Sequence, residues 1–226
     1  MIMDIHSHTF YSNCGRDDPH LTIQAAIDGG IELFGITDHN YGIGNRKKEY
    51  FDLLTALQQE YAGKIRIVRG IELATVSNLW LGDDEDISYF DYCLVEHLDS
   101  PESSVGMNIF DYAKRLACGR VGIAHTDLIA FARRLGEDPT AFLRKFADNG
   151  IFWEMNVNYD SIHRYREHPY VLRLYESEEE QAIVRNSGIE LAVGFDGHRV
   201  EDYCPERVHR MCQFMEDNHL PMVQLG

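Results

Sequence analysis

The chain has 226 residues, of which 44% are hydrophobic and 26% are charged, and its formal net charge is −16 at neutral pH. This composition excludes a disordered chain, and the acidic balance excludes a surface for long nucleic acids, which needs a basic stripe to displace counterions. Because no apolar run approaches the ~20 residues of a membrane span and no signal peptide precedes the first strand, we expect a cytoplasmic protein with reduced cysteines and no membrane contact.

Strands and helices alternate along the whole chain, with short connections and no internal repeat. In chain order, the predicted elements are strand 1–5, helix 21–28, strand 31–37, helix 46–61, strand 65–68, strand 89–95, helix 107–118, strand 121–124, helix 139–148, strand 151–155, helix 171–186, strand 189–193 and helix 205–218. Such alternation predicts a parallel sheet with crossover helices. We therefore expect one α/β domain over residues 1–226.

Polar residues follow the apolar core of nearly every predicted strand. The first example is His6 and His8, which lie two residues apart after an apolar run and would point to the same side of an extended segment. Histidines and carboxylates recur at later strand ends, and the full set is His6, His8, His39, Glu72, His97, His125, Asp196 and His198. Since only a ring brings the ends of the first, third, fifth and last strands to one point, a closed or nearly closed barrel explains this set better than an open sheet.

A single histidine at a strand end is commonly satisfied by a backbone carbonyl, but six of the eleven histidines share this position. Imidazole and carboxylate ligands without a cluster of thiols are typical of zinc, manganese or iron rather than calcium or magnesium alone. Two or three such ions a few ångströms apart could share a hydroxide and clamp a phosphoryl group during hydrolysis. The sequence has no glycine-rich phosphate loop followed by Lys-Ser or Lys-Thr, which argues against nucleotide-driven phosphotransfer.

These motifs resemble the PHP (polymerase and histidinol phosphatase) family of metal-dependent phosphoesterases. The matching pieces span about residues 1 to 200 in the family's order: Asp4-Ile-His-Ser-His-Thr9, Ile36-Thr-Asp-His39, Gly70-Ile-Glu72, His97, Ala124-His125, Glu154-Met-Asn156 and Gly194-Phe-Asp-Gly-His198. The resemblance implies a distorted, TIM-like (β/α)7 barrel with a centre of two to three divalent ions (Zn, Fe or Mn). It also implies hydrolysis of a small phosphorylated substrate.

The resemblance also implies a ligand set. The first ion would be held by His6, His8, Glu72 and Asp196; the second by Glu72 as a bridge with His97 and His125; and the third by His39, His198 and the residue at position 14. That last position usually carries His or Asp in this family, whereas here it is Cys14. Three alternatives follow: ligation of zinc or iron by the Cys14 thiolate, which we favour; replacement by Asp17 or His20; or a weak third site.

Other residues near the strand ends suggest supporting roles. Arg16, Arg164 and Arg199 are candidates for binding phosphate through bidentate hydrogen bonds, although an arginine in such a loop is more often a surface residue. Asp38 and Glu154 are candidates for orienting an imidazole.

We therefore expect a phosphomonoesterase that uses a metal-bridging hydroxide, with Glu72 as the bridge and with a metal-bound water or one of His39 and His198 assisting the leaving group. One alternative is a phosphodiesterase, a nucleotide-cleaving enzyme or a phosphotyrosine phosphatase. In the nucleotide case Phe152, Trp153, Tyr159 and Tyr165 would stack a base, although such aromatics are more often core. Another alternative is a non-catalytic metal-binding module. Eight ligand positions for three ions leave coordination unfilled, which favours catalysis.

Overall fold

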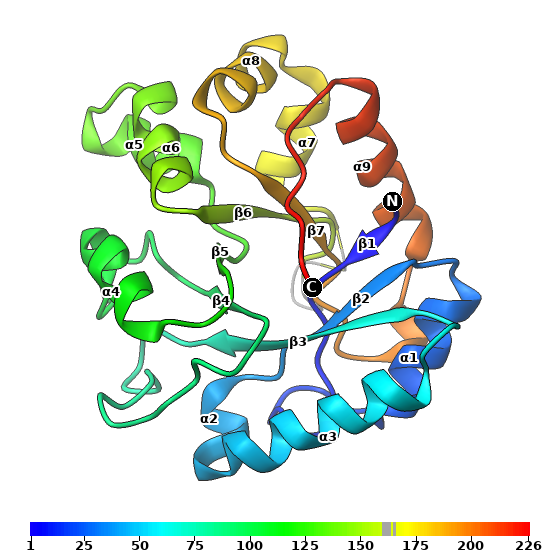
Figure 1. The fold of residues 1–226 in the computed structure, drawn as a ribbon. Coiled ribbons are helices and arrows are strands. Elements are labelled where there is room, and N and C mark those ends of the chain that lie inside the picture. The colour runs from blue at the N-terminus through cyan, green and yellow to red at the C-terminus, as the bar shows by residue number, and fades with distance from the viewer. Residues whose placement is uncertain (160–163, 165) are drawn as a thin grey trace.

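Seven parallel strands form a nearly closed barrel in the computed structural model of the chain, which describes residues 1–159, 164 and 166–226 (Figure 1). The strands lie in sequence order and are β1 (Met3–Asp4), β2 (Leu33–Ile36), β3 (Arg66–Leu73), β4 (Tyr92–Val95), β5 (Val121–Ile123), β6 (Ile151–Asn156) and β7 (Leu191–Gly194). The N–H of Ile5 donates to the carbonyl of Val193 at 2.9 Å, which joins the first strand to the last. The expected (β/α)7 barrel is confirmed.

Helices surround the barrel (Figure 1) and connect most consecutive strands, whereas the connection from β3 to β4, residues 74–91, contains no helix. They are α1 (Pro19–Asp28), α2 (Asn40–Ile43), α3 (Lys47–Glu60), α4 (Ile109–Leu116), α5 (Leu128–Leu135), α6 (Pro139–Asp148), α7 (Pro169–Glu176), α8 (Glu178–Ser187) and α9 (Pro205–Asp217), with short 3₁₀ turns at Gly44–Arg46, Gly106–Asn108 and Val200–Asp202. Among the described residues, no helix combines the length and apolar character needed to cross a bilayer. All five cysteines are free.

Large side chains on two strands fill the barrel interior opposite glycines on others. The ring of Tyr92 on β4 crosses the barrel, and a Cβ atom at Gly70 would lie 2.5 Å from that ring. Its hydroxyl donates to the carbonyl of Ile5, on the other side of the barrel. Phe152 on β6 stands against Gly122 in the same way, with 2.3 Å to an added Cβ. The interior is therefore packed below the polar end of the strands, so a site within the barrel can lie only at that end.

The C-terminal segment closes the opposite end of the barrel, where it runs to the middle of the ring of strands (Figure 1). The N–H of Leu191 donates to the carbonyl of Pro221 at 2.7 Å, and the N–H of Val223 donates to the carbonyl of Leu191 at 2.9 Å. The side chain of Leu225 is buried, and its carbonyl accepts from Arg66 at 2.9 Å. This segment therefore shields the lower core from water.

We expect Leu225→Ala to lower the free energy of unfolding by about 2–4 kcal/mol, because it leaves a cavity where a leucine that is 1% exposed packs against the core. Urea denaturation measures the loss. The matched control is Leu135→Ala, because Leu135 is 44% exposed at the end of α5 and its truncation should change stability by less than about 0.5 kcal/mol. Equal losses in the two variants would contradict the role assigned to the C-terminal segment.

Two sequence predictions of helices are corrected. The single helix expected over 171–186 is divided at Ser177, which is extended (φ −104°, ψ 102°) and whose side chain accepts from the N–H of Glu180. The acidic residues Glu178–Glu180 occupy the first turn of α8, where the helix dipole favours negative charge. Helix α5 was not predicted, although Asp127 caps its start and Gly136 ends it in the left-handed conformation.

Candidate metal centre

Side chains from the ends of all seven strands line one cavity of about 220 Å³ at the carboxyl end of the barrel. The described residues that line it are His8, His39, Glu72, Glu96, His97, His125, Tyr159, His168, Asp196 and His198. His6 lies directly beneath, fully buried. The structure therefore brings the strand-end histidines and carboxylates together, as expected from their shared position in the sequence.

Three residues that line the cavity have a left-handed backbone conformation. His97, His125 and Asp196 have φ values of 55°, 22° and 56°, which non-glycine residues rarely adopt. Each such residue costs on the order of 1–3 kcal/mol and persists only where the surroundings hold it. The N–H of His125 is held by the Glu154 carboxylate at 2.8 Å, and the N–H of Asp196 by the carbonyl of His6 at 2.7 Å.

Glu72 is the central carboxylate of the site. Its Oε2 lies 3.3 Å from His6 Nε2, 3.3 Å from His8 Nε2 and 3.0 Å from His39 Nδ1, while its Oε1 lies 3.1 Å from His125 Nε2. The two oxygens of this buried carboxylate thus face four imidazole nitrogens from three strand ends, those of β1, β2 and β5. This arrangement suits a ligand shared between two ions.

Asp196 approaches the same histidines from β7. Its Oδ1 lies 3.1 Å from His8 Nε2, 3.5 Å from His6 Nε2 and 3.5 Å from His198 Nδ1. His6, His8 and Asp196 together offer three ligand atoms within 4.8 Å of one another.

Hydrogen bonds outside the cavity determine which nitrogen of His6 and of His8 carries the proton. His6 Nδ1 lies 2.7 Å from the Glu154 carboxylate, which accepts only, so Nδ1 is protonated. His8 Nδ1 lies 3.1 Å from the Ser12 hydroxyl, whose own proton goes to Asp38 at 2.6 Å, so His8 Nδ1 also donates. The two Nε2 atoms are only 3.1 Å apart. In neutral rings both present lone pairs, an arrangement that a cation would stabilise.

The orienting roles suggested for Glu154 and Asp38 differ in the structure. Glu154 contacts an imidazole directly, at His6. Asp38 instead accepts from the N–H and hydroxyl groups of Thr9 and Ser12, at 2.6–3.0 Å. Asp38 therefore holds His8 through Ser12, whose hydroxyl also accepts from the N–H of His39 at 2.9 Å.

Within the described part of the chain, three buried polar atoms at this end of the barrel have no hydrogen-bond partner: His39 Nδ1, Glu72 Oε2 and Asp196 Oδ1. An unsatisfied buried acceptor costs about 1–3 kcal/mol, and more when it is charged. Divalent cations bound among these atoms would satisfy all three. The residues present therefore fit the metal ions that the sequence predicts.

The electrostatics of the metal-free site divide the histidines into two classes. Burial lowers the pKa of His6 and His8, but the surrounding carboxylates outweigh it and raise the pKa of both well above its usual value. For His39 and His198, burial prevails and the pKa is lowered. Burial also raises the pKa of the Cys14 thiol. At neutral pH, metal binding near Glu72 must therefore displace protons from imidazoles.

This charge distribution predicts an unusual pH dependence of stability in the metal-free protein. Burial lowers the pKa of His125, but Glu72 raises it to about 9 from 6.5. The protonated ring therefore contributes about 3 kcal/mol that is fully present below pH 6.5 and is lost as pH rises to about 9. We expect chelator-treated protein to become less stable over this range in urea unfolding, and His125→Gln to flatten the profile. A parallel profile in both proteins would contradict this origin.

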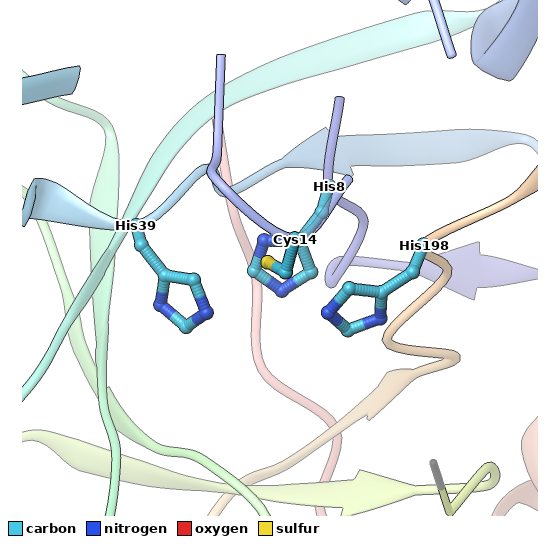
Figure 2. A group of neighbouring side chains, drawn as sticks. All are labelled: His8, Cys14, His39 and His198. Atoms are coloured by element: carbon cyan, nitrogen blue, oxygen red, sulfur yellow. The ribbon is translucent and has the colours of Figure 1, made fainter. Parts of the chain in front are cut away.

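The Cys14 side chain lies near those of His8, His39 and His198 (Figure 2). One ligand atom from each of Cys14, His8, His39 and His198 lies within 4.8 Å of the others. The two proposed substitutes have other partners: the Asp17 carboxylate accepts from the N–H of Val200, and His20 contacts Tyr61, which follows α3.

Glu96 and His168 line the cavity but are not among the site residues predicted from the sequence. Glu96 precedes His97, but its side chain is only 8% exposed, against 48% for His97. His168, at the start of α7, stacks with His125 at 6.1 Å between ring centroids and packs against Tyr159 at 4.1 Å. The two-residue period of β4 indicates that Glu96 points to the same side as Leu94, whereas no local sequence pattern indicates a role for His168.

The three candidate phosphate-binding arginines lie at the surface. Arg16 is exposed, although its N–H donates to the carbonyl of His198 at 3.1 Å. Arg164 is exposed with a φ of 60°. Arg199 pairs with Glu201 at 3.4 Å and borders a separate small cavity. None of the three is among the described residues that line the site cavity, so their role in substrate binding stays a prediction.

Residues 4–198 match the family model of the PHP domain. The chain belongs to the PHP family. No curated protein matches the sequence of this PHP chain.

Two solved structures resemble the PHP chain described here. A crystal structure of histidinol phosphate phosphatase from Lactococcus lactis subsp. lactis Il1403, complexed with zinc, L-histidinol and phosphate, has a TM-score of 0.63 at 16% identity and covers 98% of this chain and 95% of that one. A putative histidinol phosphatase from Listeria monocytogenes has a TM-score of 0.53 at 15% identity, with coverage of 88% and 96%. At these identities the two structures support the shared fold.

Proposed function

We propose that this chain is a metal-dependent phosphomonoesterase that acts on a small substrate of the histidinol phosphate type. The observation that carries the proposal is the convergence of imidazole nitrogens on Glu72 and Asp196, where three buried polar atoms have no hydrogen-bond partner among the described residues. Membership of the PHP family and the zinc, L-histidinol and phosphate in one structural neighbour support the same chemistry.

The ligand assignment follows the geometry of the strand ends. His6, His8, Glu72 and Asp196 would hold one ion; Glu72 would bridge to a second ion with His97 and His125; Cys14, His39 and His198 would hold a third. The short separations around Glu72 Oε2 and Asp196 Oδ1 support the first group. The cluster of Cys14 with three imidazoles supports the third group.

When bound, these ions would activate a bridging water as the nucleophile and neutralise charge on the phosphoryl oxygens. Glu154 and Ser12 would keep His6 and His8 in the tautomers that leave Nε2 free to bind. Because burial lowers the pKa of His39 and His198, these rings are neutral at pH 7, which favours a ligand role over proton donation to the leaving group.

The dimensions of the site favour a small monoester over a nucleotide. The described residues enclose about 220 Å³, below the range of ~300–1,000 Å³ that is usual for larger ligands. Of the aromatic residues considered for stacking a base, Phe152 and Trp153 lie in the core, only Tyr159 lines the cavity, and Tyr165 falls outside the described residues.

The deciding experiment measures metal content in protein purified without added metal, together with phosphate release from a panel of monoesters and diesters before and after chelation. We expect two to three equivalents of zinc, iron or manganese and chelator-sensitive release from small monoesters. Phosphate release from mononucleotides but not from histidinol phosphate would show that the substrate is a nucleotide and would contradict the proposed substrate class. Bound metal without turnover on any ester would point instead to a non-catalytic metal-binding module.

A further inference from the structure

The two ends of the candidate metal centre carry ligands of opposite chemical character. At one end, the Cys14 sulfur lies among the nitrogens of His8, His39 and His198 (Figure 2). At the other end, His39, Glu72 and Glu96 offer three ligand atoms within 4.8 Å of one another, two of them carboxylate oxygens. His39 belongs to both groups, and because a neutral imidazole has one lone pair, it can bind an ion at only one of the two ends.

Glu96 is placed to act as a ligand. Its Oε1 lies 3.9 Å from His39 Nδ1, one of the atoms without a hydrogen bond, and its Oε2 lies 3.9 Å from His125 Nε2. His97 lies on the exposed side, with its Nε2 3.2 Å from Glu96 Oε2. His97 thus leaves Oε1 directed toward His39 and Glu72. Ligand atoms of one ion are about 3–4 Å apart for metal–ligand distances near 2 Å, so small side-chain movements would complete this site.

The ligand sets differ in the ions they favour. Thiolate is a soft ligand that selects zinc and similar ions, whereas carboxylates also accept harder ions such as manganese. Zinc binds almost any such site more tightly than manganese does, so selectivity depends on the difference between the two affinities. A thiolate ligand increases this difference, and a second carboxylate ligand decreases it.

We propose that the centre sorts two kinds of ion, with a thiophilic ion such as Zn²⁺ at the end containing Cys14 and a harder ion such as Mn²⁺ at the end containing Glu96. The inference rests on the proposed metal-dependent function but concerns which ion occupies which end. Under limiting zinc and excess manganese, the centre therefore fills with both metals.

The test uses metal-free protein and two spectroscopic probes. One equivalent of Co²⁺, a substitute for zinc, should give a thiolate-to-cobalt charge-transfer band that Cys14→Ser abolishes. Cys14→His should lose the band yet keep the bound ion, which separates ligation from misfolding. The matched control is Cys204→Ser, since Cys204 lies near the start of α9 and contacts Glu206. It should leave the band unchanged.

Manganese binding is then measured by electron paramagnetic resonance in protein that already holds one equivalent of zinc. We expect Glu96→Gln to weaken Mn²⁺ binding at least about tenfold without changing the cobalt band. Glu190→Gln, at the opposite end of β7, is the control and should change neither signal.

Persistence of the cobalt band in Cys14→Ser would overturn the proposal, as would unchanged manganese binding in Glu96→Gln. Equal loss of both signals in Glu96→Gln would mean one undivided centre and would also overturn it. Phosphate release is recorded on the same samples. If both metal signals behave as expected but no ester is cleaved, the proposed function fails while the sorting of ions stands.

Discussion

We expect Glu72→Gln to reduce phosphate release by about 10³-fold or more and to lower the metal content of the purified protein. Glu72 faces four histidines with its two oxygens, and a glutamine offers one neutral acceptor in place of a shared anion. Loss of a metal-based contribution of about 4 kcal/mol to the reaction barrier corresponds to this factor.

The measurement pairs metal analysis with steady-state kinetics on the best monoester of the panel. Glu190→Gln serves again as the control, because its carboxylate pairs with Arg120 far from the cavity. Circular dichroism checks that the barrel remains folded. A variant with normal metal content and normal turnover would remove Glu72 from the centre and with it the assignment of a bridging ligand.

The second large effect is expected at Glu154, which contacts His6 without lining the cavity. In Glu154→Gln, the amide oxygen can accept from the N–H of His125, but the amide nitrogen then faces His6 Nδ1. His6 must accept that hydrogen bond, so its proton moves to Nε2, the atom that faces His8 and Glu72. We expect metal affinity to fall by about 10–100-fold and activity by about 10²–10⁴-fold.

Nitrogen NMR of the His6 ring distinguishes this positioning role from general loss of structure, because it reports the change of tautomer directly. The matched control is Glu180→Gln, which also alters a buried carboxylate, one that pairs with Arg133 and Arg173 away from the site. It should leave the His6 tautomer and metal affinity unchanged. An unchanged tautomer in Glu154→Gln would contradict the mechanism even if activity fell.

Strand ends account for most of what the sequence revealed about the site. His6 and His8 could be assigned to one side because the period of an extended strand is two residues. The same periodicity applies to β4: Tyr92 and Leu94 point into the barrel, and Glu96, two residues further on, points to the same side and lines the cavity. Glu96 was overlooked because His97, a more familiar ligand, follows it directly.

Helix boundaries show a similar limit. The acidic residues after Ser177 were read as the middle of one helix, although acidic residues favour the first turn. Both helices carry buried apolar residues on either side of the break, such as Leu174 on α7 and Ile183 on α8, so apolar residues alone do not mark it. The capping residue, a local signal, decided the boundary.

The sequence by itself determined the fold class and most of the candidate ligands, because alternating strands and helices form a parallel barrel and parallel strands present their carboxyl ends on one side. Only the tertiary structure decided how the ligands group. The sequence positions of Cys14, His39 and His198 are far apart, and their approach depends on loop paths that no local pattern specifies. The same holds for His168, which reaches the cavity from the start of α7. Local interactions set the elements, whereas long-range packing set the distances on which the chemistry depends.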